Sequence, residues 1–172
     1  MLKVLGALLV IMGCTGFGAA YREDMKQVLF NTRSLLMILE LLKSEIAYSK
    51  ATLPEACRMT AGRMEEPYRS SLLKIYEIMK TNRGLPFDKV WRQEMGKCLQ
   101  TVLIGKKERE LFQQFSHNTG FADNRMQIKA LEQYCDMFAQ SVRKQEENME
   151  NKAKVVMSMG FISGIFLTIV LL

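Results

Sequence analysis

Two apolar segments lie at the extreme ends of this chain, residues 2–20 and 155–172, and they constrain the fold more than any other feature. Apart from Lys3, neither segment contains a charged side chain. A helix rises about 1.5 Å per residue, so each segment comes close to spanning the ~30 Å hydrocarbon core of a bilayer. The sequence therefore predicts two transmembrane helices, with residues 22–154 forming one domain between them.

The first segment has two other interpretations. A secretory signal peptide also begins with a positive residue and an apolar stretch, and Ile11-Met12-Gly13-Cys14 loosely resembles the cleavage site of a lipoprotein. Against both interpretations, the positive region is a single lysine, Met12 is unusual beside such a site, and apolar residues continue to Ala20. A membrane anchor is favoured, and an exported or lipid-anchored domain is kept as an alternative.

Basic residues flank the inner edge of each apolar segment. The first segment is followed by Arg22, Lys26 and Arg33. The second segment is preceded by Arg143, Lys144, Lys152 and Lys154. Segments rich in Lys and Arg beside a membrane helix usually stay on the cytoplasmic side. Residues 22–154 are therefore predicted to lie in the cytoplasm, with both chain termini at the far membrane surface.

The central region is only mildly basic. It holds all 18 acidic residues and all but one of the 24 basic ones. These charges interleave along the chain, whereas a nucleic-acid-binding surface gathers cations on one face with aromatic platforms. Positive charge beside anionic lipid accounts for the surplus. The sequence therefore favours a membrane surface, and not nucleic acid, as the partner of these charges.

No group of residues in the sequence indicates a catalytic residue, a cofactor or a metal. The sole histidine, His117, stands in a polar stretch typical of a loop or a helix C-terminus, so a two-histidine metal site is ruled out. Cys57, Cys98 and Cys135 lack the spacing of metal or redox pairs and are expected to fill core positions. The chain also lacks the Gly-x-x-x-x-Gly-Lys-Ser/Thr phosphate loop. A membrane-tethered enzyme is kept as an alternative that needs an unrecognised site.

The central region is expected to be all helical, because its apolar residues recur at helical spacing without a strand or hairpin pattern. Helices are expected at residues 24–49, 54–64, 67–84 and 86–98, with a fifth marked by Leu111, Phe112 and Phe115 and a sixth starting at Asp123. Thr52 and Glu55 match a capping box. Short connections between these helices favour an antiparallel six-helix bundle, flanked by the two transmembrane helices.

The sixth helix is expected to continue into the second apolar segment, because no Gly or Pro lies between Asp123 and Met159. A flexible joint within the polar stretch 143–154 is the alternative. Small residues four positions apart let membrane helices approach closely, and two such pairs are candidate packing faces: Gly16 with Ala20 and Gly160 with Gly164. These faces could join the two segments to each other or to a partner.

Several stretches, in this order and spacing, resemble one known family. They are Met1 to Ala7, Thr15 to Phe17, Leu41 to Ser49, Thr52 to Ala56, Gly120 to Gln127 and Ser158 to Phe161. The chain resembles the stage III sporulation protein AB family of endospore-forming bacteria, which is related to the cytoplasmic domain of type II secretion F proteins. One departure is the stretch Asn118 to Arg125, where the family usually has a Leu-Gly pair before a Ser-Asp-Arg turn.

The resemblance implies a non-catalytic platform in the sporulation channel between mother cell and forespore, required for endospore formation. By analogy with secretion F proteins, the chain would couple a secretion-type sporulation ATPase to the membrane and to other stage III channel subunits. It would reside in the mother-cell (outer forespore) membrane with its central domain in the cytoplasm. The resemblance implies no cofactor, and the oligomeric state is left open, a homo-oligomer included. Analogy of fold alone does not establish such a role.

Overall fold

The computed structural model describes the backbone of residues 2–82, 84–118 and 124–171, and the side chains of residues 22–82, 84–117, 125–149 and 151. Within these residues it contains helices and no strand. The helices are α1 (Leu2–Tyr48), α2 (Leu53–Ala61), α3 (Tyr68–Thr81), α4 (Phe87–Gln100), α5 (Lys106–Asn118) and α6 (Asn124–Leu171). The all-helical fold predicted from the sequence is confirmed.

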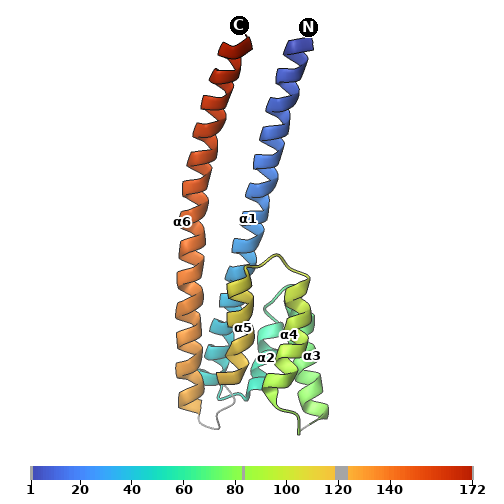
Figure 1. Ribbon diagram of the computed structural model, residues 1–172. Coiled ribbons are helices and arrows are strands. Elements are labelled where there is room, and N and C mark those ends of the chain that lie inside the picture. Colours follow the sequence, from blue (N-terminus) through green and yellow to red (C-terminus); the bar gives the residue numbers. More distant parts are fainter. Residues whose placement is uncertain (1, 83, 119–123, 172) are drawn as a thin grey trace.

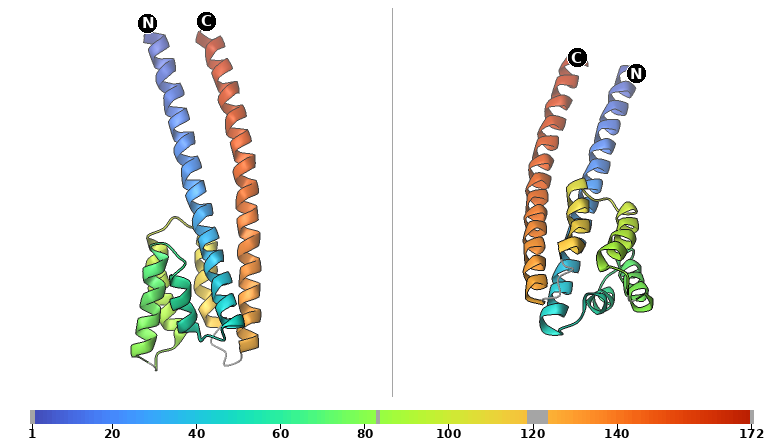
Figure 2. Two further views of the ribbon diagram at one scale, coloured as in Figure 1. Left: turned by 180° about the vertical axis from the view of Figure 1, so that it is seen from behind. Right: turned by 60° about the horizontal axis from the view of Figure 1, so that its bottom comes forward.

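Two long helices, α1 and α6, run antiparallel and extend together beyond the four short helices, so both chain termini lie at one end of the molecule (Figure 1). Each helix packs against the next along the chain, and α6 closes the bundle by packing against α1 as well as α5. Seen from behind, α1 lies in front, with α6 on one side and α2 and α3 on the other (Figure 2). The parts of α1 and α6 beyond the bundle are called the stems below.

Helix α1 is longer than the sequence suggests. A helix at residues 24–49 was expected to follow a membrane helix at residues 2–20, whereas α1 is a single helix from Leu2 to Tyr48. The charged residues at positions 22–24 mark a change in composition but include no proline or glycine that would end a helix. The predicted boundary between membrane segment and domain is therefore not a break in the backbone.

Helix α6 is continuous from Asn124 to Leu171, as predicted. The polar stretch 143–154, for which a flexible joint was the alternative, is part of this helix. The bundle is thus joined to both chain termini through uninterrupted helical backbone.

The side chains of the two predicted membrane segments lie outside the described residues. The predicted packing residues Gly16, Ala20, Gly160 and Gly164 all belong to this group. Among the side chains that the structure does describe, no helical stretch combines the length and apolar character needed to cross a bilayer. The two membrane spans and their packing faces remain predictions from the sequence.

One face of α1 supplies the centre of the core. Its residues Leu35, Ile38, Leu39, Leu42 and Ile46 are fully or almost fully buried against the shorter helices and α6. Full burial of one such side chain contributes about 1.5–3 kcal/mol. The dense apolar run in this helix therefore stabilises the bundle as a whole.

A chain of aromatic rings links α4, α5 and α6. Trp91 of α4 packs against Phe112 and Phe115 of α5, with ring centroids 5.2 and 5.1 Å apart. Its indole N–H also donates a hydrogen bond of 3.1 Å to the Phe112 carbonyl. Phe112 and Phe115 in turn meet the rings of Phe138 and Tyr134 of α6 edge-on. Trp91 therefore fills the core and satisfies its only polar group there.

Helices α3 and α4 begin close to the expected starts at residues 67 and 86, and one predicted cap is wrong. Pro67 and Pro86 stand immediately before α3 and α4. Thr52 stands before α2, but its side chain makes no capping hydrogen bond. Glu55, the other half of the expected capping box, forms an ion pair of 3.0 Å with Arg58 instead. Because Glu55 reaches forward along the helix to Arg58, the reciprocal cap is not formed.

The three described cysteines are free thiols in the core, which confirms the expectation from the sequence. Burial raises the pKa of each thiol, and the pKa of Cys135 reaches about 11. Thiolate, and not thiol, is the form that attacks electrophiles and binds metals. Cys57, Cys98 and Cys135 therefore act as small apolar residues at neutral pH.

Candidate functional site

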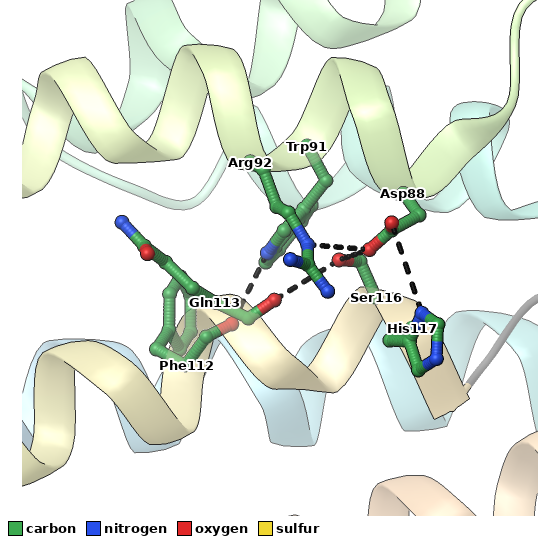
Figure 3. A network of polar contacts seen from close by, with 7 residues as sticks. All are labelled: Asp88, Trp91, Arg92, Phe112, Gln113, Ser116 and His117. Atoms are coloured by element: carbon green, nitrogen blue, oxygen red, sulfur yellow. Dashed lines mark hydrogen bonds and ion pairs between the residues drawn. The ribbon is translucent and has the colours of Figure 1, made fainter.

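A polar cluster joins the first turn of α4 to the last turn of α5 (Figure 3). The Asp88 carboxylate accepts hydrogen bonds from Ser116 Oγ at 2.7 Å and from Arg92 Nε at 2.9 Å. His117 Nδ1 lies 3.9 Å from the other carboxylate oxygen. Serine, histidine and aspartate side by side are the residue types of a hydrolytic triad, so this cluster is the first candidate for catalysis.

The order of these residues is wrong for a nucleophilic triad. In a triad the histidine lies between serine and aspartate and takes the serine proton. Here Asp88 lies between Ser116 and His117, so the serine hydroxyl donates to a carboxylate and meets no histidine nitrogen in the cluster. Ser116 is also fully buried, out of reach of a substrate. The cluster therefore lacks an activated, accessible nucleophile.

The same geometry suits a structural tie between two helix ends. A carboxylate is favourable in the first turn of a helix and a histidine in the last turn, because of the helix dipole. Burial opposes ionisation of Asp88, but the hydrogen bonds from Ser116 and Arg92 outweigh it and hold the pKa of Asp88 below its usual value. Asp88 is therefore charged at neutral pH and joins α4 to α5 at the end of the bundle away from the chain termini.

A second polar cluster joins α5 to α6. The buried Glu108 carboxylate accepts hydrogen bonds from Ser141 Oγ and, at 3.3 Å, from Gln145 Nε2. Gly105 lies beside it, where any Cβ would overlap the carboxylate. A buried carboxylate is costly without such partners. Glu108 thus fixes how the start of α5 sits along α6.

The two long helices are joined by an ion pair between Arg33 of α1 and Glu146 of α6. The side chain of Glu146 is partly exposed and has its partner on the other long helix. Pairs of this kind contribute about 0–1 kcal/mol. Arg33 and Glu146 therefore set the register of the two helices more than they stabilise the fold.

Asn31 connects α1 to two other parts of the bundle. Its amide nitrogen donates a hydrogen bond of 2.8 Å to the carbonyl of Leu103, in the connection between α4 and α5. Its amide oxygen accepts a hydrogen bond of 3.1 Å from the hydroxyl of Tyr68, at the start of α3. Burial raises the pKa of Tyr68, which keeps this hydroxyl a donor. One buried amide thus holds the short helices against α1.

These contacts hold the helices of the bundle together. Within the part of the chain whose side chains are described, no three His, Cys, Asp or Glu residues are grouped to bind a metal ion. Asn31 and Glu108 join the short helices to α1 and α6, and the Arg33–Glu146 pair joins α1 to α6. None of these pairs has a signal in the sequence, because the partners lie far apart along the chain.

Three comparisons with known proteins agree with one another. The family model described as "Stage III sporulation protein AB" matches residues 3–172. A relative from Bacillus subtilis (strain 168), "Stage III sporulation protein AB", is 27% identical over 176 residues, and the alignment covers 100% of both chains. A solved structure of a protein with the same description has a TM-score of 0.64 at 21% identity, covering 72% of this chain and 97% of that chain. At that identity the solved structure supports the fold alone.

Proposed function

The chain belongs to the stage III sporulation protein AB family and has a role in sporulation, and from this premise we propose that it is a non-catalytic membrane platform. In this proposal the protein belongs to the channel complex between mother cell and forespore. It couples a cytoplasmic secretion-type ATPase to the membrane and to other stage III subunits.

The observation that carries the proposal is the continuity of α1 and α6. Each long helix runs from the bundle to a chain terminus without a break. A bundle joined to two stems that lie side by side changes its position or tilt only if the stems move with it. This is the property that a coupling protein needs and that a tethered enzyme does not.

The membrane part of the proposal rests on the sequence together with the direction of the helices. Residues 2–20 and 155–172 span the mother-cell (outer forespore) membrane, and Gly16 with Ala20 and Gly160 with Gly164 form the packing faces. The antiparallel α1 and α6, whose free ends lie side by side, have the arrangement that two spans joined by one domain require (Figure 1). The bundle then lies in the cytoplasm, where the ATPase can reach it.

Topology is the first test. Single cysteines at Lys106 and Lys144, both exposed, are introduced into a variant without the four native cysteines. A membrane-impermeant maleimide is then applied to intact cells and to lysed cells. We expect labelling only after lysis. Labelling of intact cells would place the bundle outside and exclude a cytoplasmic ATPase as its partner.

Rigid coupling is tested by loosening one stem. Glu147 and Asn148 are exposed on α6, and glycine at each position stabilises the helix less than alanine does, by about 1 kcal/mol per residue. We expect this Gly-Gly variant to accumulate normally but to form far fewer heat-resistant spores. The matched Ala-Ala variant, which keeps the helix, should sporulate like the wild type. Equal spore counts for the two variants would argue against a rigid stem.

A further inference from the structure

The end of the bundle away from the chain termini exposes large apolar side chains that no contact described above uses. It is formed by the end of α1, the connection between α3 and α4, and the start of α6 (Figure 1). Tyr48 is 87% exposed there, Met126 59% and Leu85 36%. Together with the exposed lysines Lys50, Lys80, Lys89 and Lys129, these residues are called the distal surface.

The distal surface is positively charged. Its four lysines form no ion pair among the described residues, although Lys80 lies over the ring of Tyr76 at 5.7 Å. Of the acidic side chains at this end, Asp88 is bound by Arg92 and Ser116, and Glu55 is paired with Arg58. Glu77 and Glu132 do not balance the lysines. A partner of opposite charge therefore fits this surface best.

Tyr48 is held in place by the turn that follows it. Lys50 has a φ of 51°, in the left-handed region that residues with a side chain rarely adopt. The N–H groups of Ser49 and Ala51 both return to the carbonyl of Glu45, at 3.1 and 3.3 Å. The buried Glu45 carboxylate also accepts a 3.0 Å hydrogen bond from Ser49 Oγ. The exposed ring thus stands beside a fixed turn and not on a loose loop.

We propose that the distal surface binds an acidic patch on a cytoplasmic protein, with Tyr48 as the central apolar contact and the four lysines around it. Tyrosine is among the residues that carry most of the binding energy at protein interfaces, and surrounding charges steer and orient the partner. The inference rests on the proposed function, in which this end points away from the membrane and towards the ATPase.

A protein fits this surface better than a polyanion does. Large exposed apolar side chains accompany the lysines at this end of the bundle. Glu77 and Glu132 belong to the same helix ends, where they would repel a phosphate backbone. The lysines are also spread over α3, α4, α6 and the turn after α1. Tyr48 is the one strongly exposed aromatic ring that the structure describes beside them, whereas a single-strand binder stacks successive bases on several rings.

The test uses the full chain in nanodiscs, with the purified secretion-type sporulation ATPase as the probe. One variant reverses the lysines of the distal surface: Lys50→Glu, Lys80→Glu, Lys89→Glu and Lys129→Glu. A second variant is Tyr48→Ala. The matched control reverses four exposed lysines elsewhere on the bundle and on α6: Lys74→Glu, Lys106→Glu, Lys107→Glu and Lys144→Glu. Circular dichroism and thermal unfolding verify that all variants are folded.

We expect the Kd for the ATPase to rise about tenfold or more in both distal variants, the size of effect that a hot spot produces. The control should bind nearly as tightly as the wild type. The assignment of the surface is overturned if both distal variants bind the ATPase as tightly as the wild type does. It is also overturned if the control variant loses as much affinity as the distal variants. Absence of wild-type binding overturns the proposed coupling to the ATPase and this assignment with it. If the wild type binds RNA or anionic vesicles and reversal of the distal lysines alone abolishes that binding, the proposal of a protein partner is also overturned.

Discussion

The buried faces of α1 and α6 differ from their partly exposed faces. Inside, α1 buries a dense apolar face, and α6 adds Phe138 and Tyr134 to the aromatic core. On a partly exposed side of the same two helices, α1 and α6 are joined by the ion pair of Arg33 and Glu146. The buried faces of the two helices therefore stabilise the fold, whereas the ion pair sets the register of α1 against α6.

This difference separates stability from coupling. Apolar burial contributes several kcal/mol at a single core position, whereas an exposed ion pair contributes one or less. Changes in the buried core should unfold the bundle, and loss of the Arg33–Glu146 pair should leave it folded. A sporulation defect that arises without unfolding would then point to the stems or to the distal surface.

The largest effect is expected from Trp91→Ala. Removing a buried Trp leaves a cavity among Phe112 and Phe115 and costs about 3–5 kcal/mol of unfolding free energy. Urea unfolding of the full chain in detergent, followed by circular dichroism, measures this loss. A change below 1 kcal/mol would mean that the aromatic chain does not stabilise the bundle.

A smaller but clear loss is expected from Asn31→Ala. The change leaves the Tyr68 hydroxyl and the Leu103 carbonyl without the partner described here, and one unsatisfied buried group costs about 1–3 kcal/mol. The same unfolding experiment measures it. Tyr68→Phe, which removes only one of the two hydrogen bonds, is the matched control and should lose less. Equal stability of Asn31→Ala and wild type would show that α1 is held by its apolar face alone.

The contribution of Asp88 should depend on pH. Its pKa in the folded protein is lower than the ordinary 3.8, so protons bind more readily to the unfolded chain. The stabilisation is therefore present above pH 3.8 and is lost as the pH falls through the lower folded pKa. Urea unfolding of wild type and Asp88→Asn from pH 7 to pH 3 should show a difference that shrinks at the acidic end. A difference that grows towards low pH would contradict the sign of this shift.

The smallest change in stability is expected from Arg33→Ala. The partly exposed pair with Glu146 contributes at most about 1 kcal/mol. If the pair sets the register of the stems, spore formation should fall while the unfolding free energy hardly changes. The control is the double variant Arg33→Glu and Glu146→Arg, which exchanges the two charges and restores the ion pair. Loss of stability comparable to that of Trp91→Ala would remove the distinction between the two regions.

The positions of the helices followed from the sequence, whereas the contacts that join them did not. Apolar spacing and the prolines at 67 and 86 were enough to place the short helices, and burial of Cys57, Cys98 and Cys135 followed from the same spacing. The continuity of α1 through residues 20–24 was not predicted, because charged residues change the composition there without ending the helix.

The polar pairs needed the three-dimensional structure. Asp88 and Ser116 lie 28 positions apart, and Arg33 and Glu146 lie 113 apart. A charged residue on a helix looks solvated in the sequence unless its partner on another helix is known. The strained turn at Lys50 was equally hidden, since lysine carries none of the signals that glycine or asparagine gives for a left-handed conformation.

The closure of the bundle by its first and last helices has a consequence for biosynthesis. Leu131, Tyr134, Cys135 and Phe138 of α6 complete the core that α1 and α5 begin. A ribosome that has made everything up to α5 has therefore produced a chain whose apolar faces still lack a cover. Folding of the domain must wait until the last quarter of the chain emerges, and that is the part that carries the second predicted membrane segment. Membrane insertion of the second predicted segment and completion of the core must therefore occur close together in time. A chain that is cut short within α6 should be degraded as unfolded protein.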